Sequence, residues 1–577
     1  MWVLPFLYYH HAYPITTFYQ EWGAVLLSLL ALPLLVSKRY WQQPEIPRIV
    51  LLPIGMVLLL LVQYLLGKVL NFDQMLLLTM YFLWMALLLM LGHRVRVELG
   101  LPLLATVLAV FLVIGAELSA LVGILQRYRW HTFLDSVVTA QTSLAVYGNI
   151  AQTNHFANYI ALGLASIGLL NARWSMRVWQ TALLVMPLLL VLAWSGSRSA
   201  WLYLLFMVGM AYFWQRRDKS YLPLLKYALL LLFGFVLVQL TMQIHWQIGS
   251  SEQATPQGLT TIDRIIDDAG SSNIRLYLWK ESLLIFTQFP LLGAGFGQFA
   301  WQHFQMGAEL QNISITGLYN NAHNLLMQLA AETGLAGLSI LFGALGLWLW
   351  QAWREHRTIY HWWGYTILAV IGIHSLLEYP LWYGYFIGIA AVALGMMESK
   401  TYRLELRNLG RLSVAMMLLL GALSLVQLFQ GYKKLEATLA LRPLSGSDAT
   451  YTPRLRDSLV GVYGYALLRP YAELFMSGMI EVSADHLAEK FALNERAMRF
   501  IPIGPVAYRH AWLLALSDKP DEAKIQLKRA LWSYPDEFRA AQAELNRLAL
   551  KDPAHFSALL EFATQKYEEY QRAVSRK

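Results

Sequence analysis

The sequence predicts an all-α, polytopic membrane protein with a helical domain at its C-terminal end. Of its 577 residues, 57% are hydrophobic and only 14% are charged, whereas soluble domains carry about 25% charged residues. Twelve stretches are apolar and approach the roughly 20 residues that a membrane-spanning helix needs. Lys and Arg concentrate in alternate loops between these stretches. Together these observations predict about 12–13 transmembrane helices.

The twelve apolar runs justify the spans in order. Residues 1–9 add an apolar stub, which lacks the basic start and the cleavage site of a signal peptide. We expect this stub to be a short first span or a clipped start. The predicted spans cover residues 22–37, 49–67, 74–92, 101–125, 154–171, 178–194, 199–214, 223–243, 335–353, 362–378, 381–397 and 412–430.

The distribution of basic residues predicts the orientation of the chain. Only Lys68, Arg127, Arg129 and Arg198 lie in one set of short loops. The alternate set is far richer, so it is predicted to be cytoplasmic. Its members are Lys38, Arg39, Arg48, Arg94, Arg96, Arg173, Arg177, Arg216, Arg217, Lys219, Arg354, Arg357, Lys400, Arg403, Arg407 and Arg411.

With this orientation, two large regions fall outside the cytoplasm. Four parts result: an N-terminal transmembrane bundle (1–243), a long periplasmic loop with site residues (244–334), C-terminal transmembrane helices (335–430) and a periplasmic α-helical domain (431–577). In the last part, Arg-Ala and Pro recur with a period of 33 residues, as Arg496-Ala497 and Pro502 and then as Arg529-Ala530 and Pro535. This period favours tetratricopeptide-like helix pairs, with a plain helical bundle as the alternative.

Composition also excludes several classes of function. The net charge of +9 does not indicate nucleic-acid binding, because much of the basic charge lies in orienting loops. The absence of cysteine excludes disulfides, thiolate metal sites and thiol nucleophiles. His10, His11 and Glu21 lack the spacing of a helical zinc site, and no Asp-x-Asp occurs on the outer face. We expect no metal and no cofactor.

Two arginines are candidates for binding phosphate. Arg198 lies in Ser195-Gly-Ser-Arg198, between two spans that have almost no loop between them. An arginine at such a place is costly unless it snorkels, pairs or lines a wet cavity, and a guanidinium grips phosphate in a bidentate fork. Arg275 lies in the long outer loop. A headgroup anchor for Arg198 and a solvated side chain for Arg275 are the alternatives.

His323 is the candidate proton acceptor. It lies in Asn320-Asn-Ala-His-Asn324, before a stretch that reads as a short helix ending at Gly334. An imidazole can take a hydroxyl proton near neutral pH, and Asn321 and Asn324 flank it as possible substrate-binding amides. The alternative is a capping cluster, since Asn caps helices well.

Further polar side chains are expected at the same membrane surface. Gln152 and Asn154 lie at the outer end of a span, where amides can bind sugar hydroxyls or a neighbouring helix. Glu378 and Tyr379 form an outer turn. Glu378 could pair with His374, four residues earlier, or could steady Arg198 or His323.

The convergence of these groups predicts a chemistry. Arginines suit a diphosphate, the histidine suits activation of a hydroxyl, and the spans suit a lipid carrier. Together they describe the transfer of a group from a lipid-linked diphosphate to an acceptor hydroxyl.

At this point the sequence resembles the O-antigen ligase/polymerase superfamily, and more specifically its bacterial protein O-oligosaccharyltransferase branch of the PglL type. Residues 10–400 carry the resemblance. The superfamily motifs are Gln152-Thr-Asn154, Asn158-Tyr159, Ser195-Gly-Ser-Arg198, Arg275 with Trp279, Pro290 to Gly297 and Asn321-Ala-His323-Asn324; the branch motifs are His11-Ala-Tyr-Pro14 with Phe18 and Glu21, and His374 to Tyr383.

The resemblance implies a GT-C-like, metal-independent, inverting glycosyltransferase of the bacterial inner membrane, with its active site facing the periplasm. Its donor would be an undecaprenyl-diphosphate glycan, and its acceptor a Ser or Thr hydroxyl of a periplasmic protein such as a type IV pilin. His323 would act as base, alone or with Glu378, and Arg198 and Arg275 would hold the diphosphate.

Other functions remain open from the sequence. An O-antigen polymerase or an O-antigen ligase would use the same donor with a different acceptor. A transporter of lipid-linked glycans predicts inverted repeats and polar groups near mid-membrane, whereas here the polar groups gather at the outer boundary.

Overall fold

The structure is a computed structural model that describes residues 1–576 except 43, 70, 144, 244–268, 356, 405–406, 444–447 and 449. Its described part is built almost entirely of helices. The first helices are α1 (Leu4–Leu7), α2 (Phe18–Leu29), α3 (Leu51–Leu65), α4 (Phe72–Leu99), α5 (Leu101–Tyr128), α6 (Thr153–Trp174), α7 (Val178–Trp194), α8 (Ser199–Arg217) and α9 (Leu222–Gln243). The next are α11 (Ala269–Gln288), α12 (Phe299–Leu310), α13 (Leu325–Arg354), α14 (Ile359–Ser375), α15 (Gly384–Met397) and α16 (Arg407–Leu439).

Every predicted span coincides with a helix, so the prediction of a multi-pass, all-α membrane protein is confirmed. Among the described residues, seven helical segments are long and apolar enough to cross a membrane, and α7 and α15 are shorter apolar helices. The other three predicted spans correspond to α6, α8 and α14. The N-terminal stub forms only the single turn of α1, which is far too short to span.

The predicted outer loop at 244–334 is not irregular where the structure describes it. Its first part, residues 244–268, lies outside the described residues. From residue 269 onward the chain forms α11, α12 and the first turns of α13. Phe304 and Ala308 of α12 join the hydrophobic core of the C-terminal domain. Helix α11 packs its apolar residues with α12 and α13, and α12 also packs on the C-terminal domain. Both helices form because they have such apolar partners, since helical periodicity rarely suffices without one.

A break in α13 is stabilised by the glycine-rich segment that precedes α12. Gly334 has non-helical backbone angles, φ 60° and ψ −155°, which free backbone groups on either side. The segment takes them up: the N–H groups of Ala294 and Gly295 donate to the carbonyls of Ala331 and Glu332, at 2.9 and 3.1 Å. Gly293 is therefore part of a close backbone approach, and the segment is a structural turn.

The ends of the helices define two opposite faces. One face, called the basic face here, carries the arginine-rich loops. On it, β1 (Glu45–Pro47) pairs antiparallel with β2 (Thr401–Arg403), and Trp214 donates to the carbonyl of Thr358 at 3.1 Å. Loops that the charge pattern assigned to one side of the membrane thus touch each other.

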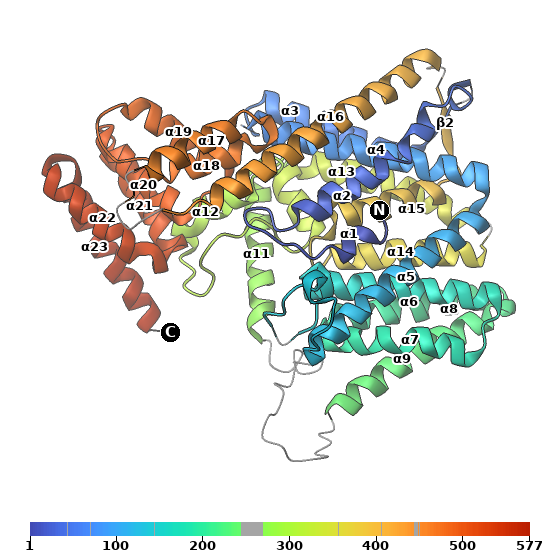
Figure 1. Ribbon diagram of the computed structural model, residues 1–577. Coiled ribbons are helices and arrows are strands. Elements are labelled where there is room, and N and C mark those ends of the chain that lie inside the picture. Colours follow the sequence, from blue (N-terminus) through green and yellow to red (C-terminus); the bar gives the residue numbers. More distant parts are fainter. Residues whose placement is uncertain are drawn as a thin grey trace.

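The C-terminal domain lies at the other end of the bundle, where the orange and red helices gather in Figure 1. It contains α17 (Tyr451–Tyr463), α18 (Arg469–Ser477), α19 (Leu487–Phe500), α20 (Gly504–Leu516), α21 (Pro520–Ser533), α22 (Phe538–Lys551) and α23 (Pro553–Ser575). The predicted boundary at 430/431 falls inside α16, which continues to Leu439 as one helix. The tetratricopeptide-like repeat stays a prediction.

Candidate functional site

A single carboxylate gathers the predicted site residues. Glu378 follows α14 and is only 4% exposed. Its Oε1 accepts hydrogen bonds from Arg275 Nη2 at 2.5 Å and from Asn154 Nδ2 at 2.7 Å. Its Oε2 lies 2.9 Å from His323 Nδ1. Residues from α6, α11, the turn before α13 and the turn after α14 therefore meet at one carboxylate, here called the Glu378 cluster.

Asn154 is held in place by its own helix and by the neighbouring turn. Gln152 caps the N-terminus of α6, accepting from the His155 N–H at 2.5 Å. Asn154 is the second residue of α6. Its amide oxygen accepts a hydrogen bond from Ser197 Oγ at 2.8 Å. Because its Nδ2 donates to Glu378, Asn154 bridges the Ser195–Arg198 turn to the carboxylate. Gln152 itself acts here as a helix cap.

Helix α11 brings Arg275 to the cluster. One turn further along, Trp279 donates from Nε1 to the carbonyl of Ala322 at 3.1 Å. Ala322 directly precedes His323, so α11 contacts the histidine turn at two points, through Trp279 and through the shared carboxylate. Arg275 is 27% exposed, which leaves part of its guanidinium open to a ligand.

The turn that carries His323 is shaped by the two asparagines. His323 adopts φ 51°, and its N–H donates to Asn321 Oδ1 at 2.7 Å. Asn324 caps α13 through the N–H groups of Leu326 and Met327, at 2.9 and 3.1 Å. The prediction that Asn caps this helix is therefore correct. The same turn also brings the imidazole of His323 to Glu378.

The second ring nitrogen of His323, Nε2, is the atom that could accept a proton. With Nδ1 bound to Glu378 Oε2, Nε2 of His323 makes no hydrogen bond to any residue that the structure describes. The side chain is 26% exposed, and its ring packs edge-on against Tyr379, with centroids 5.1 Å apart. A carboxylate that accepts from Nδ1–H fixes the tautomer in which Nε2 can accept a proton.

Electrostatics keep Glu378 ionised. Burial raises the pKa of its carboxyl, but the hydrogen bond from His323 and the nearby charges of His323 and Arg275 outweigh burial, so the pKa lies below its ordinary value of 4.5. A permanent carboxylate at this point stabilises a protonated imidazole and a guanidinium at the same time.

Arg198 is linked to the Glu378 cluster by its neighbour in the sequence. It directly follows Ser197, which bonds Asn154, and it occupies the N-cap position of α8. Its side chain is half-buried. Two predicted phosphate ligands therefore flank Asn154: Arg275 shares Glu378 with it, and Arg198 adjoins its other partner.

One of the alternatives, a pairing of His374 with Glu378, is not what the structure shows. The Glu378 N–H donates to the carbonyl of His374 at 2.8 Å, but the two side chains have different partners. His374 Nε2 lies 2.8 Å from His155 Nδ1, and Tyr203 Oη lies 2.8 Å from His374 Nδ1. This buried network behind the site includes Tyr203, which the sequence reasoning missed because a lone tyrosine in an apolar run carries no distinctive signal.

The N-terminal histidines do not form a metal site in the structure. Both ring nitrogens of His11 lie near backbone carbonyls, at 3.0 Å from Thr16 and 2.9 Å from Asn149. Within the described residues, no three His, Asp or Glu side chains are arranged to hold a metal ion.

A large cavity begins beside the cluster. It has a volume of about 930 Å³ and is lined mainly by apolar side chains. Leu325 and Ser375, next to the cluster in sequence, line it at one end. Trp214, Trp353 and Arg357 line it toward the basic face. A large cavity with a mainly apolar lining has the character of a site for a lipid chain.

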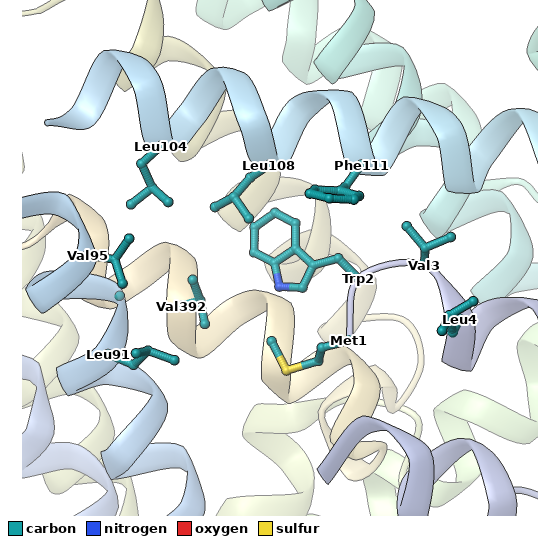
Figure 2. A pocket seen from close by; sticks show the side chains of 11 residues that line it. Met1, Trp2, Val3, Leu4, Leu91, Val95, Leu104, Leu108, Phe111 and Val392 are labelled. Carbon is teal, nitrogen blue, oxygen red and sulfur yellow. The ribbon is translucent and has the colours of Figure 1, made fainter. Parts of the chain in front are cut away.

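A second cavity, of about 390 Å³, has a different character. Figure 2 shows Trp2 between Leu108 and Phe111 of α5 on one side and Met1 on the other. The side chains that line it are apolar apart from the indole N–H of Trp2. It is a crevice between α4, α5 and α15.

Three family models match the chain. The one described as "O-Antigen ligase" covers residues 182–342, which include Arg198, Arg275 and His323. "Protein glycosylation ligase" covers 146–170, with Asn154, and "Virulence factor membrane-bound polymerase, C-terminal" covers 362–548, with Glu378. All three matches contribute a residue to the Glu378 cluster.

The fold is that of a multi-pass membrane protein, and these matches make the chain similar to the O-antigen ligase family. Two curated relatives, both from Acinetobacter baylyi, narrow the resemblance. The chain is 27% identical to a "General O-oligosaccharyltransferase" over 68% of this chain and 67% of that one. It is 24% identical to a "ComP-specific O-oligosaccharyltransferase" over 64% of this chain and 65% of that one. The predicted resemblance to the oligosaccharyltransferase branch is confirmed.

Proposed function

We propose that this protein transfers a glycan from undecaprenyl diphosphate to Ser or Thr hydroxyls of proteins outside the cytoplasm, such as a type IV pilin. The observation that carries the proposal is the Glu378 cluster, in which one carboxylate orients an imidazole and a guanidinium toward the same space. The names of the two relatives support a protein acceptor.

His323 acts as the general base. The acceptor hydroxyl attacks the anomeric carbon, the bond from that carbon to the diphosphate oxygen breaks, and Nε2 takes the hydroxyl proton. Glu378, 2.9 Å from Nδ1, stabilises the imidazolium that forms. The arrangement follows the logic of a carboxylate that orients a catalytic histidine.

Arg275 and Arg198 bind the leaving diphosphate. A guanidinium near the scissile bond neutralises the charge that grows on the diphosphate, and this stabilisation is largest where water is excluded. Arg275 already contacts Glu378 through Nη2, and its remaining N–H donors are the ones offered to phosphate. A single displacement with no protein nucleophile inverts the anomeric centre, and it needs neither a metal ion nor ATP because the donor is already activated.

The apolar cavity of about 930 Å³ accommodates part of the polyprenyl chain. This arrangement places the lipid within the bundle and the diphosphate at the Glu378 cluster. The excess of basic residues on the opposite face supports a site that faces the periplasm in the inner membrane.

The decisive test replaces His323 by Ala. Glycosylation of the acceptor protein should fall at least about 100-fold, the lower range of a lost general base, while the amount of membrane-inserted enzyme stays unchanged. The assay is the mass shift of the acceptor protein in cells and with purified enzyme and donor. His131→Ala is the matched control, since this outer histidine is 94% exposed and its side chain pairs with Asp135. A fully active His323→Ala enzyme would refute the assignment.

A second candidate function is O-antigen ligation or polymerisation, which the matches to "O-Antigen ligase" and the membrane-bound polymerase favour. Both reactions use the same donor and the same cluster. Purified enzyme given the lipid-linked glycan together with a protein, a glycan or a lipid A core distinguishes them by which acceptor gains mass.

A further inference from the structure

Besides Arg357, which lines it near the basic face, the large cavity has a group of polar residues at one end. Thr17, Glu21, Tyr81, Tyr383 and Tyr471 line this part, whereas most of the remaining wall is aliphatic or aromatic. They come from the segment before α2 and from α2, α4, the turn before α15 and α18 of the C-terminal domain. Because that domain contributes Tyr471, this end opens on the side of the Glu378 cluster, away from the basic face.

Glu21 is unusual among these groups because only one of its oxygens is used. Its Oε2 accepts from the N–H of Gly384 at 2.6 Å and from the hydroxyl of Tyr81 at 3.1 Å. Its Oε1 is buried and has no hydrogen-bond partner in the described part of the chain. A buried acceptor without a donor costs free energy, so its retention needs an explanation.

Capping of α15 explains the position of one carboxyl oxygen of Glu21, Oε2. Gly384 is the first residue of α15, and an anion at a helix N-terminus is favourable. A Cβ at residue 384 would lie 2.6 Å from Glu21 Oε2, so glycine there permits the approach. The cap, however, needs Oε2 alone and leaves Oε1 without a role.

The surroundings indicate what kind of ligand would supply the missing donor. A hydrocarbon chain has no donor. A diphosphate has none either. A saccharide supplies hydroxyl donors together with apolar C–H faces, and tyrosine rings give such faces a flat surface to pack on.

We propose that Glu21, with Tyr81, Tyr383 and Tyr471, forms a binding subsite for a saccharide unit of the donor glycan. The inference rests on the proposed function and adds a place where the enzyme recognises sugar. Tyr383 links this saccharide subsite to the reaction centre: its ring lies 5.9 Å from that of Tyr379, which lies 5.1 Å from the His323 ring. The two rings thus offer the glycan a path from the sugar at His323 toward Glu21.

Glu21→Gln separates sugar binding from helix capping. The amide oxygen of Gln still accepts from Gly384 and Tyr81, but an N–H₂ group replaces the free acceptor Oε1. Two probes are compared on purified enzyme: undecaprenyl diphosphate without sugar, and undecaprenyl diphosphate bearing the glycan. The variant should bind the glycan-bearing lipid about tenfold more weakly, a loss of about 1.4 kcal/mol, and the sugar-free lipid with unchanged affinity.

Controls make each outcome decisive. Glu98→Gln is the matched control, because Glu98 is exposed on the basic face beside Arg94, and both probes should bind it normally. Equal weakening of both probes, or of neither, in Glu21→Gln overturns the subsite. Should that variant fail to fold, Tyr471→Ala decides, since it removes a ring from the same end without touching the cap. Selective binding without transfer to protein would refute the proposed function and leave the subsite standing.

Discussion

At the scale of single residues, Glu378 organises the site. It is nearly buried and contacts Asn154, Arg275 and His323. His323 keeps a left-handed backbone conformation, which is uncommon outside glycine although histidine tolerates it better than most residues. Strain of this kind persists where the surroundings over-determine it, and such positions cluster at functional sites. The two asparagines and the carboxylate provide that support.

Replacing Glu378 by Gln should destabilise the protein in a pH-dependent way. The folded pKa of the carboxyl lies below 4.5, so its contribution to stability is present above pH 4.5 and is lost as the pH falls through the folded pKa. We expect a loss of about 1.5–3 kcal/mol at pH 7, the range for hydrogen bonds to charged groups. The gap between wild type and variant should shrink at pH 4 and below. Thermal unfolding in detergent measures it, and a gap that is independent of pH would contradict the electrostatic role.

At the scale of elements, the break in α13 and the glycine-rich segment depend on each other. Each supplies backbone groups that the other lacks, so neither is stable alone. This pair holds the beginning of α13, and therefore Asn324 and His323, against α11. The histidine turn is thus positioned by backbone hydrogen bonds between distant segments.

Gly293→Ala should disrupt this arrangement far more than Gly67→Ala. Both glycines have nearly the same backbone conformation, φ 70° and φ 68°, so both substitutions cost about 1–2 kcal/mol of conformational strain. At Gly293 the new methyl group also overlaps the backbone of Glu332 and Thr333, whereas at Gly67 it meets nothing within 4 Å. Yield and thermal stability of the two variants in detergent measure the difference; equal stability would show that the close approach is not needed.

Some elements could be predicted from the sequence pattern alone, and others could not. The twelve apolar runs became helices because each carries its own backbone hydrogen bonds in lipid. Helices α11 and α12 were missed because their formation depends on partners far away in sequence. The alternative of a His374–Glu378 pair does not hold, because His374 binds His155 and Tyr203 while Glu378 binds His323. The sequence identified four site residues one by one: Asn154, Arg275, His323 and Glu378. That the Glu378 carboxylate contacts the other three is visible only in the tertiary structure.

At the scale of the whole molecule, two faces carry different chemistry. Loops rich in Lys and Arg meet at the basic face, where β1 and β2 pair. The Glu378 cluster and the C-terminal domain lie together at the other end, since α12 packs into the core of that domain. The C-terminal domain therefore lies on the same side of the bundle as the Glu378 cluster.

The absence of cysteine allows the orientation to be measured directly. Phe133→Cys, on the loop after α5 and 91% exposed, should react with a membrane-impermeant thiol reagent in intact spheroplasts. Lys219→Cys, exposed on the basic face, should react only after the membrane is opened. The unmodified chain, which has no thiol, is the control. The reverse labelling pattern would place the site in the cytoplasm and end the proposal of a periplasmic enzyme.

The sequence by itself determined that the chain crosses a membrane repeatedly, which loops share a side, and which polar residues stand out against the apolar background. These properties follow from local composition, since each helix satisfies its own backbone and each loop carries its own charge. Only the tertiary structure decided that Glu378 binds His323 rather than His374, that one buried oxygen of Glu21 has no partner among the described residues, and that α12 belongs with the C-terminal domain. Such contacts join segments from tens to hundreds of residues apart, and their geometry depends on how whole helices pack.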